Sequence, residues 1–465
     1  MPSFRIITFG CKVNQCDSAG LFQNLTARGW TAASEGESPN LILVNTCTVT
    51  ARADQQARQA VRRLAREHPG AAILVTGCYA QRAPEEMAAL PGVRVVMGNQ
   101  EKAGLADLIN SIDYVGIKLS GFPSADALDS FFPSPWRGEG QGGGENNLVF
   151  YVTGPGEEFH PWPVSPFPQH TRPRLKIQDG CNHGCAYCIV PKVRGRSRSL
   201  AGAEVETALE KLAAQDCREV VLTGVDLGQY GRDLNPHTDL AALLRRLRGR
   251  PWPFRVRLSS LEPHEVTLEL LEECAAWENF SPHFHLPLQS GSGAVLRAMG
   301  RPYGPDDFRD LVMEINCRFP DAGLGLDVLA GFPGETATDF EATWSLVEAL
   351  PVTYLHVFPF SPRPGTAAAG LAPLPHREVK RRALVMRDLG RRKKVAFLES
   401  QLGKVRQVLV EREAPEAGGL QGLTDNYLRV RLPGPAEWRN RLIQVRLREI
   451  RGETLVGEAA DRLPD

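Results

Sequence analysis

Residues 174–188 read RLKIQDGCNHGCAYC, a short apolar strand pattern followed at once by Cys181, Cys185 and Cys188. The thiols are four and three residues apart, and no fourth cysteine lies nearby. A structural zinc site takes four ligands, and a disulfide framework takes an even number of cysteines in a secreted chain. Three thiolates instead suit a [4Fe–4S] cluster, in which one iron stays open for another ligand. The stretch therefore predicts an iron–sulfur site directly after a strand.

Further strand patterns follow this stretch, with amphipathic helical patterns between them. Together with the first, the strand candidates are 174–178, 219–224, 255–260, 283–287, 323–331 and 354–360. Six strand–helix units predict a partial (β/α)6 barrel over residues 172–398. Chemistry in such barrels gathers at the C-terminal ends of the strands. The three cysteines follow the first strand, where a catalytic cluster is expected.

The N-terminal residues 1–112 show another alternation of strands and helices, which predicts an open parallel α/β sheet. Cys11, Cys47 and Cys78 each stand at the end of a predicted strand. Open sheets gather their ligand groups at the carboxyl ends of the strands, so these thiols should meet at one edge. Buried free cysteines are common core residues. Three of them at equivalent strand ends favour a ligand role.

The remaining four cysteines lie outside both triplets. Cys217, Cys274 and Cys317 stand in helical patterns, which predicts core positions for them. Cys16 could complete a Cys₄ zinc site with the three N-terminal thiols, and this alternative stays open.

Two other regions differ in character from the α/β parts. Residues 113–171 are expected to form a linker or insertion, since 123–170 are rich in Gly and Pro and lack periodicity. A loosely packed and partly disordered segment is expected there. Residues 399–465 carry short strand patterns with turn residues between them, which predicts a small β-barrel. The expected fold class is α/β, with an open sheet, a central barrel and this terminal barrel.

Charge and hydropathy limit the function classes. Lys+Arg and Asp+Glu both number 54, so a polyanion would have to be attracted by local patches. The candidates are RGRSRS at 194–199, the basic helix at 376–394 and the terminal barrel. The sequence shows no signal-peptide pattern and no run of about 18 apolar residues. A cytoplasmic protein without a membrane span is expected, and in that reducing compartment cysteines favour ligand roles.

The CxxxCxxC pattern at 181–188, with Tyr187 before its last cysteine, resembles the cluster motif of radical S-adenosylmethionine (SAM) enzymes. Within these, the chain is most similar to the methylthiotransferases. The motifs that carry this likeness are GCKVNQ, NTCTVT, GCYAQ, KIQDGCNHGCAYCIVPKVRGRSRS, HLPLQSGS and GFPGET. They span nearly the whole chain except the insertion, which departs from the family's shorter linker.

The resemblance implies two [4Fe–4S] clusters and SAM as cofactors. The radical cluster would be held by the triplet at 181–188, and an auxiliary cluster by Cys11, Cys47 and Cys78. The family also implies SAM contacts at strand ends, of which Thr223 and Gly224 would meet the methionine part. The full set of candidate contacts is Tyr187, Thr223, Gly224, Gln289, Asp327 and Gly331. The last three would meet ribose or adenine, and a turn or packing role remains an alternative.

The terminal barrel resembles the TRAM RNA-binding module of this family, which implies tRNA as a partner. GCKVNQ, NTCTVT and TGVDLGQYG are most similar to the group that modifies threonylcarbamoyladenosine 37 in the anticodon loop. The product would be the 2-methylthio derivative. C2 of adenine is an unactivated C–H position, so radical chemistry and a sulfur donor are needed. An electron donor such as a flavodoxin or ferredoxin is also implied.

Alternative functions remain open at this point. The same chemistry could act on isopentenyladenosine 37 of tRNA, or on a ribosomal protein. A more distant alternative is a non-enzymatic iron–sulfur or zinc protein that binds RNA.

Overall fold

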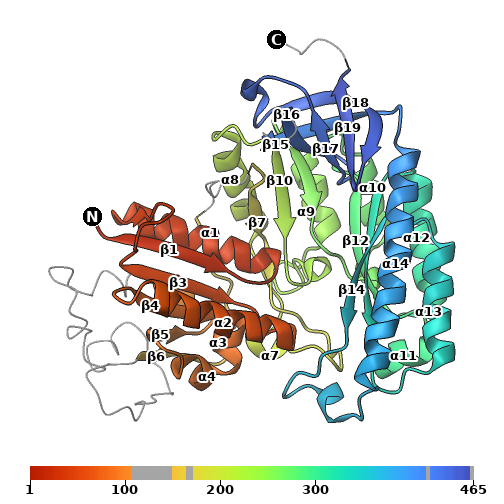
Figure 1. Cartoon of the computed structure of the whole chain (residues 1–465). Coiled ribbons are helices and arrows are strands. Elements are labelled where there is room, and N and C mark those ends of the chain that lie inside the picture. The colour runs from red at the N-terminus through yellow and green to blue at the C-terminus, as the bar shows by residue number, and fades with distance from the viewer. Residues whose placement is uncertain (106–148, 164–170, 415–418, 461–465) are drawn as a thin grey trace.

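The computed structural model describes residues 1–105, 149–163, 171–414 and 419–460. Figure 1 shows an N-terminal α/β part beside a central barrel, with a small C-terminal β-barrel at one end of the central barrel. This arrangement confirms the α/β fold class predicted from the sequence.

The N-terminal part is a six-stranded parallel sheet in the order β2-β1-β3-β4-β5-β6. Its strands are β1 Ser3–Thr8, β2 Thr31–Ala32, β3 Leu41–Thr46, β4 Ala72–Gly77, β5 Val93–Met97 and β6 Val149–Tyr151. The connecting helices are α1 Lys12–Ala27, α2 Ala51–Glu67, α3 Cys78–Arg82 and α4 Pro84–Ala88. Leu21 and Leu25 of α1 pack in one core, and Val61 and Leu64 of α2 pack in another. The sheet is therefore covered by helices on both faces, as parallel sheets require.

Residues 149–163 are packed onto this sheet rather than forming a loose insertion, and 149–151 are its strand β6. β6 pairs with β5, with Val149 opposite Val95. Trp162 packs against the α1 core, and its indole N–H donates to Asp17 Oδ1 at 2.9 Å. The expectation of loose packing at 123–170 is wrong here, because a three-residue strand is too short to show periodicity. Residues 106–148 and 164–170 lie outside the described chain.

The central part is built from two three-stranded parallel sheets, β7-β10-β11 and β12-β13-β14. A bridge between Val256 and Phe280 lies where they meet. The strands are β7 Arg174–Lys176, β10 Glu219–Thr223, β11 Arg255–Leu258, β12 His283–Gln289, β13 Gly323–Ala330 and β14 Tyr354–Pro359. All six strands predicted from the sequence are present, so the partial barrel is confirmed.

Helices cover the outside of this barrel (Figure 1). They are α7 Val190–Arg194, α8 Gly202–Ala213, α9 Leu240–Arg248, α10 Leu268–Ala275, α11 Gly293–Ala298, α12 Pro305–Arg318, α13 Ala337–Ala349 and the long α14 His376–Ser400. Side-chain caps begin several of them: Asp239 caps α9, Thr267 caps α10 and Thr336 caps α13. A short antiparallel pair, β8 Gln178–Asp179 and β9 Arg198–Ser199, lies on either side of the cysteine loop in sequence.

The C-terminal part is a closed five-stranded barrel in the order β15-β16-β17-β19-β18. Its strands are β15 Val405–Ala414, β16 Gly419–Thr424, β17 Arg429–Leu432, β18 Leu442–Arg451 and β19 Thr454–Ala459. Arg255 and Arg257 of β11 are buried against it and donate to backbone carbonyls, among them that of Leu423. Glu219 is buried between the two guanidinium groups. These contacts fix the small barrel to one end of the central barrel.

The cysteines outside the triplets do not all follow the prediction. Cys217 and Cys274 are buried, but Cys317 is exposed on α12. The core position predicted for Cys317 is wrong because α12 buries its other face, through Phe308, Val312 and Ile315. No helix in the described part of the chain is both long and apolar enough to cross a membrane.

Candidate active site

The N-terminal thiols follow three neighbouring strands of one parallel sheet. Cys11 lies between β1 and α1, Cys47 follows β3, and Cys78 begins α3 directly after β4. Gly10, with φ +98°, lies so close to Cys47 that a Cβ would stand 2.8 Å from its sulfur. The loop after β1 is thus pressed against the loop after β3, and the three cysteines lie at one edge of the sheet.

Burial and neighbouring charges shift the pKa of Cys47 among these thiols. Burial, followed by the neighbouring Cys78, raises the pKa of Cys47 to about 12. Cys78 is buried as well, whereas Cys11 is exposed. A thiol like that of Cys47 stays protonated at neutral pH unless a positively charged group displaces the proton. A metal centre supplies that charge.

The three sulfurs of each triplet are not gathered as closely as a single metal ion requires. A tetrahedral zinc site with Zn–S bonds of about 2.3 Å would hold its sulfurs about 3.8 Å apart. The three N-terminal sulfurs do not all lie within 4.8 Å of one another, and neither do those of the barrel loop. An iron–sulfur cube holds each thiolate on a different iron, so it does not require the sulfurs to lie so close together.

Cys16 does not join the N-terminal triplet. Its thiol lies 3.6 Å from the carbonyl oxygen of Arg174 and lines a separate cavity of about 220 Å³ that Trp162 also lines. Burial, followed by Asp17, raises its pKa to about 12. The Cys₄ zinc alternative is therefore not assembled in this structure.

The barrel triplet occupies one loop after β7 and β8. Backbone hydrogen bonds shape it: Cys181 N–H donates to Gly195 O at 3.0 Å, and Ala186 N–H to Met299 O at 2.9 Å. Gly180 has φ +74°, and a Cβ there would stand 1.9 Å from the carbonyl oxygen of Arg196. Only glycine fits this close approach of two backbone segments. The three cysteines are half-buried, so a cluster on them would still be accessible from one side.

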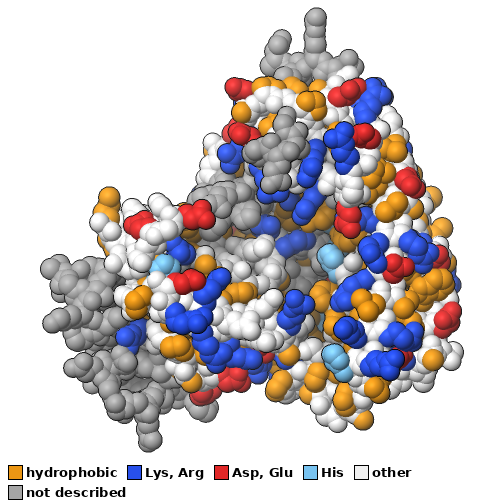
Figure 2. All heavy atoms as spheres, viewed as in Figure 1, with side chains coloured by type: hydrophobic (Ala, Val, Ile, Leu, Met, Phe, Trp, Pro, Cys, Tyr) orange, Lys and Arg blue, Asp and Glu red, His pale blue; other side chains and the backbone are white. Residues whose placement is uncertain are grey.

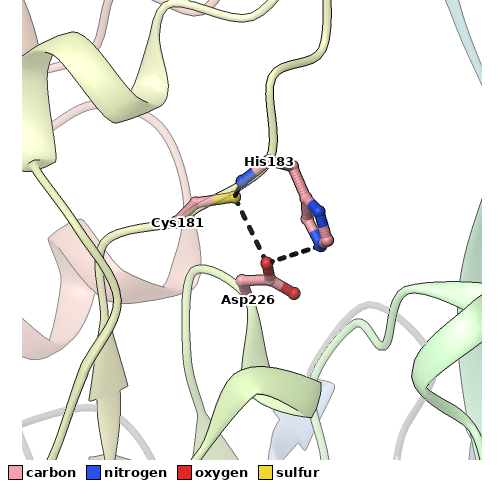
Figure 3. Close-up of side chains that lie close together, drawn as sticks. All are labelled: Cys181, His183 and Asp226. Carbon is pink, nitrogen blue, oxygen red and sulfur yellow. Dashed lines mark hydrogen bonds and ion pairs between the residues drawn. The ribbon is translucent and has the colours of Figure 1, made fainter. Parts of the chain in front are cut away.

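Three polar side chains other than the cysteines lie at or near Cys181: Asp226, His183 and Glu265. Its Sγ lies 3.2 Å from Asp226 Oδ2, and His183 Nε2 lies 3.0 Å from the same oxygen (Figure 3). Glu265 Oε1 lies 3.4 Å from His183 Nε2. Hydrogen bonds to Asp226 and Glu265 raise the pKa of His183 to about 10. Asp226 lies in TGVDLGQYG, where a polar residue after a strand was the available signal.

A guanidinium group stands beside the second cysteine of the loop. Arg301 Nη1 lies 3.5 Å from Cys185 Sγ and 2.8 Å from Glu262 Oε2. Its side chain is buried, and it also donates to Pro287 O at 3.2 Å. Donors to a ligand sulfur tune the potential of an iron–sulfur cluster. Sequence reasoning missed Arg301, which lies in a turn with no motif of its own.

The structure places the other predicted site residues mainly at strand ends. Thr223 ends β10 and is buried, and a Cβ on Gly224 would stand 2.6 Å from Gln178 Oε1. Gln289 ends β12 with φ +65°, a strained backbone for a residue other than glycine. Gly331 follows β13 with φ +80°, and its N–H donates to Glu335 Oε2 at 2.9 Å. Four of the candidates thus lie at the C-terminal rim of the barrel.

The remaining two candidates lie elsewhere. Tyr187 is packed against an apolar cluster that includes Met299 and Phe332. Asp327 lies within β13 rather than at its end, between His285 of β12 and His356 of β14. The side chains of these three residues form a group whose ligand atoms lie within 4.8 Å of one another.

A buried ion network joins the two cysteine sites. Asp17 of α1 pairs with Lys102, Lys176 and Arg194 at 2.7, 2.9 and 3.1 Å. Arg194 also pairs with Asp179 at 2.9 Å, and Cys78 and Cys11 are the thiols that interact with it electrostatically. These cations hold the pKa of Asp17 well below its usual range despite burial. The network ties the end of the N-terminal sheet to the start of the barrel.

This network corrects one prediction for RNA contact. Arg194 and Arg198 of RGRSRS are buried, and only Arg196 of its arginines is exposed. The charge run alone predicts a surface patch, because the sequence does not show that carboxylates from another region are buried beside it.

A large basic cavity lies between β14, α14 and the C-terminal barrel. Its volume is about 1180 Å³. The view in Figure 2 shows Lys and Arg side chains gathered over this side of the molecule, beside a hollow that faces the N-terminal part. The basic residues that line the cavity are Arg172, Arg174, Arg387, Arg391, Lys394, Arg412 and Arg429. Such a concentration in a chain of zero net charge suits a polyanion.

Known proteins resemble both halves of this site. Residues 3–98 match the uncharacterized protein family UPF0004, and residues 175–347 match the radical SAM superfamily. Threonylcarbamoyladenosine tRNA methylthiotransferase MtaB of Aquifex aeolicus is 34% identical, with 92% of this chain and 96% of that protein covered. The tRNA-2-methylthio-N(6)-dimethylallyladenosine synthase of Dictyoglomus thermophilum is 33% identical, with 98% of each covered.

Among solved structures, the radical SAM methyltransferase TsrM of Kitasatospora setae superposes with a TM-score of 0.51. The sequence identity is 18%, and 79% of this chain and 75% of that chain are covered. This likeness concerns the fold alone.

Proposed function

The chain belongs to the methylthiotransferase family of radical SAM enzymes, and from this premise we propose that it converts N6-threonylcarbamoyladenosine 37 of tRNA to its 2-methylthio derivative. The convergence of two cysteine triplets at the strand ends of two joined parallel sheets is the observation that carries the proposal. SAM and [4Fe–4S] clusters are the cofactors of this family.

We assign one cluster to each triplet. Cys181, Cys185 and Cys188 would hold the radical cluster, and the N-terminal triplet would hold the auxiliary cluster. When bound, these groups together with SAM supply the radical, the methyl group and the sulfur that substitution at C2 of adenine requires. The donor sets fit this role, because each offers three free thiols, which leaves one iron of a [4Fe–4S] cluster open for another ligand.

The side chains around the loop would position SAM and tune the cluster. Arg301 directs a guanidinium N–H at Cys185, which stabilises negative charge on the sulfur. Thr223, Gly224, Gln289 and Gly331 lie where SAM would be held at the rim of the barrel. The strained backbone of Gln289 supports this assignment, since such strain is concentrated at functional sites.

The tRNA would bind along the basic cavity and the C-terminal barrel. Phosphates suit the arginines of α14 and of β15 and β17, which line the cavity. Adenosine 37 would have to leave its stack to reach the barrel interior. The reaction also requires a sulfur donor and an electron donor such as a flavodoxin or ferredoxin, and we place it in the cytoplasm with its tRNA substrate.

The substrate is tested by turnover of defined tRNAs. Anaerobically reconstituted enzyme, SAM and a reductant are incubated with tRNA that carries threonylcarbamoyladenosine, isopentenyladenosine or unmodified adenosine at position 37. Nucleosides are then analysed by mass spectrometry. We expect the methylthio product only from the threonylcarbamoylated tRNA. Equal or better turnover of the isopentenylated tRNA would overturn the substrate and leave the enzyme class standing.

A further inference from the structure

Two imidazoles and a carboxylate meet on three adjacent barrel strands. His285 Nε2 lies 3.2 Å from Asp327 Oδ1, His356 Nδ1 lies 3.3 Å from the same oxygen, and the two nitrogens are 3.2 Å apart. Asp327 Oδ1 is shielded from solvent, yet neither imidazole is aligned to give it a hydrogen bond. Ser260 Oγ lies 2.8 Å from His285 Nδ1 and fixes that ring. The two imidazoles hydrogen-bond to each other through these nitrogens, so Asp327 Oδ1 is left as a buried acceptor without a hydrogen bond.

The cluster opens toward the basic cavity through His356. This side chain is 54% exposed and lines the cavity, whereas that of His285 is 8% exposed. Tyr354, also on β14, lines the same cavity and hydrogen-bonds His283 at 2.7 Å. A group that enters the cavity can thus reach His356 and its two neighbours without a rearrangement of the strands.

Two cations near His285, Asp327 and His356 have no direct side-chain partner in the described part of the chain. Lys12 and Arg174 form no side-chain hydrogen bond or ion pair within the described part of the chain. The charges that act on Lys12 include Asp327 and Arg174, so the three lie in one region between α1 and the barrel. Lys12 is half-buried and follows Cys11 directly. Cations left unpaired at partial burial are costly unless an anion joins them.

The chemistry of the proposed substrate matches this arrangement. A threonylcarbamoyl group carries a carboxylate, a hydroxyl and ureido N–H groups, all beside the adenine ring. An isopentenyl group is apolar and would leave these charges and the Asp327 oxygen without partners. The region is thus suited to a polar and anionic substituent on the base.

We propose that Lys12, Arg174 and His356 recognise the threonylcarbamoyl carboxylate, and that Asp327 accepts a hydrogen bond from the ureido or hydroxyl group. This inference rests on the proposed function and names the residues that select its substrate. His285 is a positioning residue, since Ser260 holds its ring and it faces Asp327. Specificity then arises from groups on both sides of the space between the N-terminal sheet and the barrel.

The test compares two forms of one tRNA, with the threonyl carboxylate intact or converted to its carboxamide. We expect wild-type enzyme to prefer the carboxylate about 10- to 100-fold in kcat/KM, as hydrogen bonds to charged groups allow. His356→Ala and Arg174→Gln should each reduce that preference about tenfold, with slower turnover of the carboxylate form and little change for the carboxamide. Lys12→Met should do the same, and Lys12→Arg should restore part of the preference.

Arg391→Gln is the matched control, because Arg391 lines the same cavity on exposed α14 and pairs only with Asp388 in the described chain. It should weaken both tRNA forms equally. Iron content is measured for every variant, so that loss of the auxiliary iron–sulfur cluster next to Lys12 is recognised. If the Lys12 variant loses iron, the preference of the His356 and Arg174 variants for the carboxylate tRNA decides whether the inference holds.

Two results would overturn the inference while leaving the proposed function intact. One is equal turnover of the carboxylate and carboxamide tRNAs by wild-type enzyme. The other is stoichiometric zinc in the purified holoenzyme that His356→Ala removes, since the cluster would then be a metal site. Failure of the threonylcarbamoylated tRNA itself to react would instead contradict the proposed function.

Discussion

The two cysteine triplets each offer three thiols, but the fold brings these thiols together in different ways. In the barrel, one eight-residue loop supplies Cys181, Cys185 and Cys188, and its shape depends on local contacts such as Cys188 N–H to Cys185 O at 3.0 Å. In the N-terminal part, the thiols come from three separate strand ends, and only the parallel order of β1, β3 and β4 brings them together. A local motif can be found by spacing alone, whereas a dispersed one requires the topology of the sheet.

The largest expected effect separates the two sites by role. Cys185→Ala should reduce reductive cleavage of SAM to background, because the loop loses one of its three thiols. Cys47→Ala should abolish the methylthio product while SAM cleavage continues uncoupled from it. 5′-Deoxyadenosine and product are measured in the same reactions, with exposed Cys317→Ala as the control.

Equal loss of SAM cleavage in both cysteine variants would contradict this division. The two sites would then act as one unit rather than as a radical site and a sulfur site.

The next effect concerns the connection between the sites. Arg194 is buried between Asp17 and Asp179, so Arg194→Met leaves carboxylates poorly paired in the interior. We expect a loss of about 3–5 kcal/mol in the free energy of unfolding, the range for breaking one side of a buried ion pair. Denaturant unfolding at matched iron content measures it. Exposed Arg196→Met should change stability by less than about 0.5 kcal/mol, and equal effects would refute the structural role of Arg194.

A smaller effect is expected within the barrel site alone. Arg301→Met removes the donor to Cys185 Sγ and the partner of Glu262. SAM cleavage should slow about 10- to 100-fold with iron retained, as for other residues behind metal ligands. Arg297→Met, on exposed α11 surface, should leave the rate unchanged. An unaltered rate in the Arg301 variant would show that its contact with the sulfur has no role in the reaction.

The smallest effect concerns the proposed tRNA interface, the basic cavity beside the C-terminal barrel. Arg412 and Arg429 are exposed and line the basic cavity on the C-terminal barrel. Changing both to Gln should weaken tRNA binding severalfold and reduce the slope of log K against log salt by about 1–2, if each contacts a phosphate. Filter binding over a salt series measures this slope. An unchanged slope would show that neither arginine contacts a phosphate and that the tRNA binds to another face of the protein.

Strands and site residues could be predicted from the sequence where a strand is an apolar run that ends in a cysteine. LILVNTC and AAILVTGC predicted β3 and β4, and the parallel order then placed Cys47 and Cys78 at one edge. The barrel strands were found for the same reason. β6 was missed because three residues far along the chain pair with β5 only in three dimensions.

The burial and the ion-pair partners of charged residues could not be predicted from the sequence. Arg194 and Arg198 looked like a surface patch, but carboxylates from distant elements bury them. His183 and Arg301 carry no spacing signal, since their partners Asp226, Glu262 and Cys185 come from other loops. Periodicity shows which face of an element is apolar, and it does not show which ions pair across elements.

The most direct test of the account is the metal content of anaerobically reconstituted protein. Two clusters predict about eight irons and eight sulfides per chain. A variant with Cys11, Cys47 and Cys78 all changed to Ala should retain about four, and so should one with all three barrel cysteines changed. One zinc at the N-terminal triplet, with about four irons in the wild-type chain, would contradict the two-cluster assignment.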